Sequence, residues 1–390
     1  MERIIPYIQK NIIKVIVGQR RVGKSCFLQQ IASMYRNKFS EIPVVYINME
    51  DIEFEEITNY KKLVEYAEKT KGDSEKAAIF VDEIQEIKEF EKALRHFQTK
   101  GVWDIYCTGS NAGLLSGELA TLLTGRYIEI RMYGLSYSEF LKFHSMNETK
   151  LNFDKYIRYG GLPFLINLEL EDNVVFQFLK NIYEAILFKD VIGRYQIRNV
   201  SFLQKLTQYI SDNIGNIVSA RKISEFLKSQ QLSVSTNVVL DYLNYLSNAM
   251  LIYKVPRYDL KGKKVLEINE KYYFEDLGIR HAIVGYKHND ISQIIENIVF
   301  KHIIINQYEV YIGKLDDKEI DFVCTKNGKQ MYIQVTLSLS EEQVRNREFG
   351  NLLAIDDNLR KLVITTDEYT SQDYKGVEIL NIREFLLLRI

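Results

Sequence analysis

The stretch GQRRVGKS, residues 18–25, decides how this chain folds. It follows an apolar run, residues 12–17, that predicts a buried strand, and a helical pattern begins at Ser25. Gly18 and Gly23 allow the backbone to curl so that its N–H groups point inward, and the helix adds its positive N-terminal end. The stretch fits the pattern G-x-x-x-x-G-K-[ST], which predicts a loop that holds the phosphates of a nucleotide.

The fixed positions of this loop have separate expected roles. Lys24 is expected to reach the β- and γ-phosphates, and the Ser25 hydroxyl is expected to bind Mg²⁺. The sequence therefore predicts ATP and Mg²⁺ as ligands. The predicted nucleotide-binding residues are Gly18, Gln19, Arg20, Arg21, Val22, Gly23, Lys24, Ser25 and Cys26.

A pair of carboxylates follows a second apolar run, residues 77–81. A buried parallel strand would bring Asp82 and Glu83 to the edge of the sheet that carries the phosphate loop. Asp82 is expected to orient Mg²⁺, and Glu83 to polarise the attacking water as a general base. An isolated Asp-Glu pair is usually a solvated helix cap, but after a phosphate loop it favours ATP hydrolysis.

Two further catalytic candidates are less specific. Ser110 follows a strand predicted at 103–108 and would sense the γ-phosphate, with Asn111 as second choice; both also suit a turn and helix cap. Arg126 precedes a strand predicted at 127–132 and would act as an arginine finger, in cis or from a neighbouring subunit. An exposed surface arginine is the alternative.

The order of predicted elements indicates the fold class. Strands alternate with helices over residues 1–140, which predicts an α/β domain with a parallel sheet of the P-loop type. Residues 141–205 are expected to form a helical lid. Residues 206–280 predict a winged helix, and residues 281–390 a second α/β domain.

Composition excludes several classes of protein. Lys and Arg number 51 and Asp and Glu 52 in 390 residues, so an overall basic nucleic-acid binder is excluded, although a local basic patch is not. We expect Cys26, Cys107 and Cys324 to be buried, reduced thiols. No run suits a signal peptide or a membrane span, which predicts a cytoplasmic protein without membrane contact.

Several segments of the chain form a recognisable set: GQRRVGKS, IFVDEIQEI, YCTGSNAGLLSGELATLLTGRYIEI, YGLSYSEF, YGGLPFL, LFKDVIGRYQIRN, VPRYD and KEIDFV. Together they resemble a large prokaryotic family of AAA+-like P-loop ATPases with a C-terminal domain of unknown function. The resemblance implies a helical lid, a winged helix and a C-terminal fold like that of restriction endonucleases. It also adds weight to Arg126, because the Gly-Arg step belongs to the pattern.

The nuclease-like segment departs from the residues that cleavage requires. Restriction-endonuclease-like sites hold Mg²⁺ with an Asp and a Glu and use a nearby Lys. Asp321 matches the Asp, but Gln334 and Thr336 stand at the Glu and Lys positions. Glu296 could supply one carboxylate, but it could not replace both the missing Glu and the missing Lys. We therefore expect an inactive nuclease fold, with an active Mg²⁺-dependent nuclease as the less favoured alternative.

Three functions remain open for the whole chain. Residues 221–264 hold eight basic and three acidic residues, with Lys261, Lys263 and Lys264 at the wing tip, which favours an ATPase that acts on DNA. The near-zero net charge and the eroded nuclease site favour a signalling ATPase that binds a protein partner. A small-molecule kinase is the third reading. The oligomeric state is open and includes a homo-oligomer.

Overall fold

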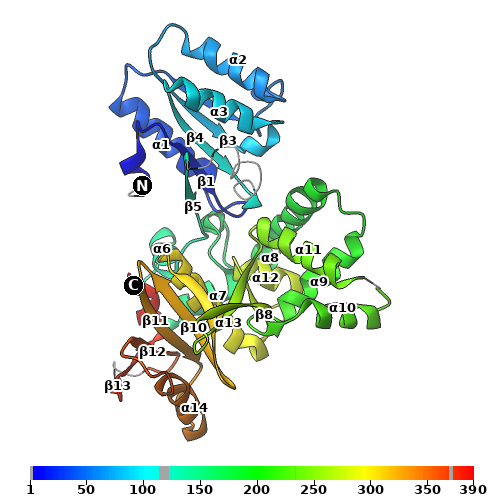
Figure 1. The fold of residues 1–390 in the computed structure, drawn as a ribbon, viewed down its shortest axis with the longest axis vertical. Coiled ribbons are helices and arrows are strands. Elements are labelled where there is room, and N and C mark those ends of the chain that lie inside the picture. The colour runs from blue at the N-terminus through cyan, green and yellow to red at the C-terminus, as the bar shows by residue number, and fades with distance from the viewer. Residues whose placement is uncertain (1–2, 114–122, 124, 233, 369–371) are drawn as a thin grey trace. The chain divides into compact units, whose positions relative to one another are not determined.

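The computed structural model describes residues 3–113, 123, 125–232, 234–368 and 372–390 (Figure 1). The chain forms two compact units. The first unit comprises Met1–Tyr133 together with Asn248–Met250, and the second comprises Gly134–Ser247 together with Leu251–Ile390. The predicted lid, winged helix and C-terminal domain thus belong to one compact unit.

The first unit is a parallel five-stranded sheet in the order β2-β3-β4-β1-β5. The predicted α/β fold with a parallel P-loop sheet is confirmed. Its elements are η1 (Ile5–Tyr7), β1 (Ile13–Val17), α1 (Lys24–Lys38), β2 (Val44–Asn48), η2 (Ile52–Phe54), α2 (Tyr60–Lys71), β3 (Ala77–Asp82), η3 (Ile84–Glu86), α3 (Phe90–Lys100), β4 (Trp103–Gly109) and β5 (Tyr127–Arg131).

Helices cover both faces of this sheet. Alternate residues of a strand point to opposite faces, so β1 places Val15 in one hydrophobic cluster and Ile16 in the other. The cluster around Val15 includes residues of α2 and α3, whereas the cluster around Ile16 includes residues of α1. Because both faces are covered, β1, β3 and β4 are buried along their whole length, as expected for a parallel sheet (Figure 1).

The second unit joins a helical part to a mixed nine-stranded sheet in the order β13-β14-β12-β11-β10-β9-β7-β8-β6. Its elements are α6 (Tyr137–Phe143), α7 (Lys150–Tyr159), η4 (Pro163–Asn167), α8 (Asp172–Ala185), η5 (Ile186–Gly193), α9 (Val200–Asp212), β6 (Ile217–Val218), α10 (Ala220–Ser229), α11 (Thr236–Asn248), β7 (Ile252–Asp259), β8 (Lys264–Phe274), α12 (Leu277–Val284), η6 (His288–Asp290), α13 (Ile291–Ile305), β9 (Glu309–Leu315), β10 (Lys318–Lys326), β11 (Lys329–Thr336), α14 (Glu342–Leu353), β12 (Arg360–Thr365), β13 (Gln372–Tyr374), β14 (Val377–Asn381) and α15 (Ile382–Leu387).

A parallel pairing connects the two predicted C-terminal domains. Strands β7 and β8 form an antiparallel hairpin, and β7 also pairs with β9 through Arg257–Ile312, Tyr258–Gly313 and Asp259–Lys314. The predicted boundary at residue 280 therefore lies in α12, between strands of one continuous sheet. Strand β8 is 11 residues long, and its C-terminal half pairs with both β6 and β7.

The two helices before the hairpin each begin at a serine cap. Ser219 caps α10 by accepting a hydrogen bond from the N–H of Lys222, and Ser235 does the same for Val238 in α11. Helix α8 begins at Asp172 and continues as the π-helix η5. The two capped helices are followed by the β7–β8 hairpin.

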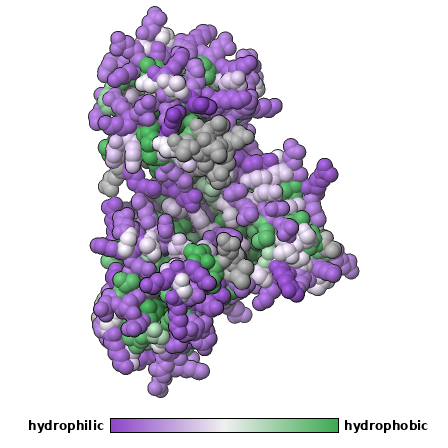
Figure 2. Space-filling model, in the orientation of Figure 1, coloured by the Kyte–Doolittle hydropathy of each residue, from purple (hydrophilic) through white to green (hydrophobic). Residues whose placement is uncertain are grey.

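The face drawn in Figure 2 is mostly hydrophilic, with small apolar areas between charged and polar side chains. Within the described part of the chain, no helix combines the length and the apolar character needed to cross a membrane.

Candidate functional site

The turn after β1 has the backbone geometry that its glycines predict. Gly23 adopts φ 97°, a conformation in the left-handed region that favours glycine, and α1 begins at the next residue. A side chain on Gly18 would put its Cβ 2.5 Å from the Met132 carbonyl oxygen. The Lys24 ammonium donates to the Gln19 carbonyl at 3.2 Å, across the loop that both residues belong to.

We expect Gly18→Ala to damage this loop. The added methyl would also lie 2.9 Å from Val22 Cγ2, so backbone and side chain would both have to move. We expect a loss of about 1–3 kcal/mol in unfolding free energy, as for overpacked cores, and weaker ATP binding. Chemical denaturation and ATP titration measure these effects. Gly350→Ala is the matched control, because a Cβ at Gly350 meets nothing within 4 Å and the residue lies in α14.

Asp82 lies at the carboxyl end of β3 and is buried. Its carboxylate accepts hydrogen bonds from the hydroxyls of Ser25 and Thr108. Burial raises the pKa of Asp82, and these two hydrogen bonds partly oppose that shift. The two predicted Mg²⁺ ligands, Ser25 and Asp82, are therefore neighbours, and they offer the oxygen atoms that this ion prefers.

Glu83 is brought to the same edge by an unusual backbone conformation. Its φ is 54° and ψ 51°, and its N–H donates to the Thr108 hydroxyl at 2.8 Å. Glu83 Oε1 lies 3.7 Å from the Lys24 ammonium, while Oε2 accepts a hydrogen bond from the Gln85 amide. Burial raises the pKa of Glu83, but the charge of Lys24 and the Gln85 hydrogen bond outweigh it, and the pKa lies below its ordinary value.

The two sensor candidates follow β4 and are both buried. The Ser110 hydroxyl lies 3.4 Å from the Gln85 amide nitrogen, which places it next to Glu83. The Asn111 side-chain oxygen accepts from the N–H of Gly113 at 2.6 Å, as in a turn. The alternative of a turn residue therefore suits Asn111, whereas Ser110 contacts the candidate site.

Arg126 does not lie near this site. It precedes β5, whose first residue Tyr127 pairs with Ile13 at the start of β1. The phosphate loop follows the other end of β1, about 20 Å away at the usual rise per strand residue. A role as an arginine finger in cis is therefore wrong for this fold. Arg126 is exposed, so its role from a neighbouring subunit stays a prediction.

The remaining predicted nucleotide-binding residues differ in exposure. Gln19 and Val22 are buried, and the Gln19 amide donates to the Met250 carbonyl at 3.2 Å. Arg20 pairs with Glu50 at 3.5 Å, and Arg21 is exposed. Cys26 is also exposed, so the expectation of three buried thiols is wrong for this residue, which lies in the first turn of α1.

Sequence reasoning missed Thr108 and Gln85. Thr108 contacts both acidic residues at the end of β3, and Gln85 contacts Glu83 and Ser110. A signal existed for Thr108, since it lies near the carboxyl end of β4, the strand next to β3. Gln85 follows Glu83 by two residues, and only the short helix η3 turns its amide back toward the carboxylate.

In the second unit, a lysine lies among the acidic residues of the nuclease-like region. Lys271 of β8 is 5% exposed, and its ammonium lies 2.9 Å from Glu296 Oε1 and 2.8 Å from Glu319 Oε1. Tyr273 donates to Glu296 at 2.5 Å. Burial lowers the pKa of Lys271, but the charges of Glu296, Asp321 and Glu319 outweigh it and raise the pKa. A protein-borne cation thus neutralises this cluster.

The nuclease-motif residues themselves are bound to each other. Asp321 accepts from the N–H of Val335 at 2.8 Å, and Gln334 accepts from the N–H of Asp321 at 2.6 Å. The Gln334 amide donates to Glu348 at 2.7 Å. Burial and the charge of Glu296 raise the pKa of Asp321 well above its usual range. Among residues that the structure describes, no group of three or more His, Cys, Asp or Glu is arranged to hold a metal ion.

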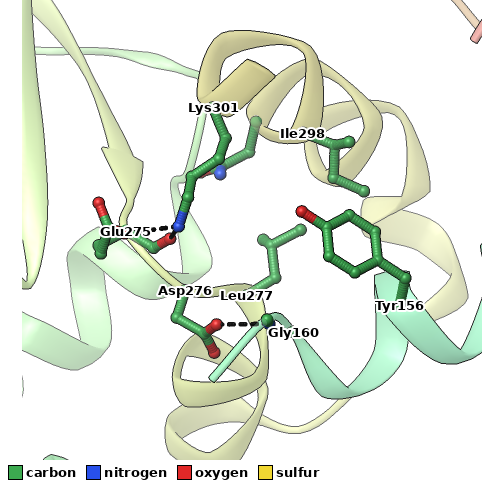
Figure 3. Close-up of a pocket in the computed structure, with 9 residues that line it drawn as sticks. Tyr156, Gly160, Glu275, Asp276, Leu277, Ile298 and Lys301 are labelled. Atoms are coloured by element: carbon green, nitrogen blue, oxygen red, sulfur yellow. Dashed lines mark hydrogen bonds and ion pairs between the residues drawn. The ribbon is translucent and has the colours of Figure 1, made fainter. Parts of the chain in front are cut away.

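A small pocket elsewhere in the second unit is lined by charged residues that have partners (Figure 3). Lys301 pairs with Glu275 at 2.5 Å, and Asp276 accepts from the N–H of Gly161 at 2.7 Å. A Cβ on Gly160 would collide with the Asp276 carboxylate, which explains the glycine there. These contacts join α12 and α13 to the turn after α7, so we assign them a structural role.

Two family models match separate parts of the chain. A family model described as an AAA domain matches residues 10–141, and one described as a domain of unknown function (DUF8612) matches residues 150–290. An uncharacterized protein of Haemophilus influenzae is 34% identical to this chain, over 99% of the chain and 97% of the relative. The chain belongs to this AAA-domain family. The resemblance to AAA+-like P-loop ATPases is thereby confirmed.

Other members and solved structures extend the comparison. An uncharacterized protein of Methanocaldococcus jannaschii is 30% identical to this AAA-domain chain, over 85% of the chain and 76% of the relative. A solved structure of a Walker-type ATPase of Pyrococcus abyssi covers 73% of the chain and 93% of its own length. Its sequence identity is 14% and its TM-score 0.48.

Proposed function

We propose that this chain binds ATP with Mg²⁺ at residues 18–26 and hydrolyses it to ADP and phosphate. The observation that carries the proposal is the meeting of four side chains at one sheet edge: Lys24 lies beside Glu83, and Ser25 lies beside Asp82. A nucleotide-binding loop alone would explain Lys24 and Ser25. Glu83 lies beside them with a pKa below its ordinary value, so its carboxylate is in the ionised form that can take a proton from water.

The reaction requires few groups from the protein. The oxygen of a water molecule attacks the γ-phosphorus, its proton passes to Glu83, and the bond from the γ-phosphorus to the oxygen of ADP breaks. Lys24 and the N–H groups of the loop hold the phosphate oxygens and stabilise their charge. Glu83 returns its proton to solvent afterwards.

Mg²⁺ fits this edge of the sheet. The Ser25 hydroxyl and the Asp82 carboxylate are adjacent oxygen donors, and the Thr108 hydroxyl also donates a hydrogen bond to this carboxylate. When bound, Mg²⁺ neutralises the charge of the phosphates. Mg²⁺ favours the ionised form of Asp82 and so opposes the effect of burial on the pKa of this carboxyl.

We further propose that the second unit binds nucleic acid through a winged helix formed by α10, α11 and the β7–β8 hairpin. Lys263 and Lys264 at the hairpin tip are exposed, whereas Lys261 pairs with Asp316 at 2.7 Å. Pairing of β7 with β9 fixes the hairpin to the sheet, so these two lysines are presented by a rigid element. The run α13, β9, β10, β11, α14, β12 is the proposed inactive nuclease-like fold.

Salt-dependent DNA binding tests this part. We expect duplex affinity to fall with salt, and Lys263→Gln with Lys264→Gln to reduce the logarithmic salt slope by about 2, since each phosphate contact contributes about 0.9. Lys287→Gln is the control, because this exposed lysine lies outside the hairpin and pairs with Asp212. The measurement is a gel shift at several salt concentrations. If DNA binding changes neither with salt nor in the hairpin variants, the alternative is favoured, which is a signalling ATPase that binds a protein partner.

Two residual proposals have direct tests. Arg126, exposed before β5, is proposed to act on ATP bound by a neighbouring subunit of a homo-oligomer. Loss of turnover in Arg126→Ala, regained by mixing with the Lys24→Ala chain, would support that role. Mg²⁺-dependent nicking of DNA that disappears in Asp321→Ala would contradict the proposal that the nuclease-like fold is inactive.

A further inference from the structure

The amide of Gln85 contacts the two candidate catalytic side chains that come from different strands. Its nitrogen donates to Glu83 Oε2, after β3, and lies 3.4 Å from the hydroxyl of Ser110, after β4. Gln85 itself lies in η3, the single turn that follows Glu83. The side chain therefore bridges the ends of two neighbouring strands at the proposed site of hydrolysis.

These contacts involve one end of the amide. The other end, Gln85 Oε1, is buried and has no hydrogen-bond partner among the described atoms. A glutamine that served only to hold the fold together would be expected to use both ends, because a buried unpaired acceptor costs about 1–3 kcal/mol. The contacts of Gln85 are instead directed at Glu83 and Ser110.

The two oxygens of Glu83 have different partners. Oε1 lies beside Lys24, and Oε2 is held by Gln85. On the proposed function, ATP draws Lys24 to its phosphates, so the contact at Oε1 is released when substrate binds. Oε1 then faces the attacking water while Oε2 stays fixed, which gives the carboxylate one orientation.

We propose that Gln85 is a positioning residue for the base Glu83 and that it couples the base to Ser110. The inference rests on the proposed ATPase function and adds a residue to it. A change at Ser110, which lies next to the predicted position of the γ-phosphate, would then move the base through one shared amide. Gln85 also supplies hydrogen-bond donation that favours the ionised carboxylate.

Steady-state kinetics of Gln85→Ala test the inference in the full chain with ATP and Mg²⁺. We expect kcat to fall about 10-fold to 100-fold, the range for loss of a hydrogen bond to a charged group, with little change in KM. Gln85→Glu keeps the size of the side chain but places a second carboxylate beside Glu83, so kcat should fall at least as far.

Glu86→Gln is the matched control. Glu86 lies in the same turn and is exposed, so we expect wild-type kcat and KM. Wild-type kcat in Gln85→Ala, or a change confined to KM, would overturn the inference while the ATPase proposal stands. Absence of turnover in the wild-type chain would overturn the proposed function, and this inference with it.

Discussion

Glu83→Gln should bind ATP as the wild type does and hydrolyse it about 10²-fold to 10⁴-fold more slowly, the usual contribution of a general base. The amide has nearly the same size and keeps one acceptor for Gln85, but it cannot take a proton from water. It also loses the charge that lies 3.7 Å from the Lys24 ammonium. Lys24 is then freer to meet phosphate, so ATP binding should be unchanged or tighter. Equilibrium binding of ATP and steady-state phosphate release measure the two effects.

Lys24→Ala provides the comparison. This change removes the cation that the phosphates require, so we expect loss of both ATP binding and turnover. A site in which Glu83 merely caps η3 would show equal turnover in wild type and Glu83→Gln. Weakened ATP binding in Glu83→Gln would likewise contradict its assignment as a base, since it would give the carboxylate a role in holding the nucleotide.

Lys271→Ala should lower the free energy of unfolding by about 3–5 kcal/mol, the cost of removing one partner from a buried ion pair. Lys271 contacts Glu296 of α13 and Glu319 of β10, and Asp321 adds its charge. Without the ammonium these acidic groups repel each other in a buried place. The loss should shrink as pH falls, because burial and the charge of Glu296 raise the pKa of Asp321, and protonation of Asp321 removes part of that repulsion. Denaturant titration at two pH values measures it.

Lys261→Ala is the matched control. Its ion pair with Asp316 is exposed on both sides, so we expect a change of about 0–1 kcal/mol. A second variant separates charge from packing: Lys271→Met with Glu296→Gln removes the cation and one carboxylate, and should recover part of the lost stability. If the double variant is less stable than Lys271→Ala, repulsion between the carboxylates is not the cause.

The phosphate site could be predicted well because its parts are local. The spacing of Gly18, Gly23, Lys24 and Ser25 is enough to predict the phosphate loop. Parallel strands also bring their carboxyl ends to one edge of the sheet. This rule therefore predicts that Asp82 and Glu83 lie near the loop. The same rule, applied to the start of β5, shows why Arg126 cannot act in cis, but it requires the pairing of β5 with β1, which the sequence does not reveal.

The second unit could be predicted only in outline. Lys271 belongs to β8, and its acidic partners lie on a later helix and a later strand. The paired residues of β7 and β9 lie more than fifty positions apart in the sequence, and no local pattern predicts this pairing. Gln85 was missed for a similar reason. Its role depends on one turn of η3 that directs its amide back to Glu83.

Phosphate release from ATP by the full wild-type chain with Mg²⁺, measured beside Glu83→Gln at equal ATP occupancy, tests the proposed hydrolysis most directly. We expect steady multiple turnover in the wild type and release about 10²-fold or more slower in the variant. ATP binding without turnover in the wild type, or equal release by both proteins, would contradict hydrolysis at this site.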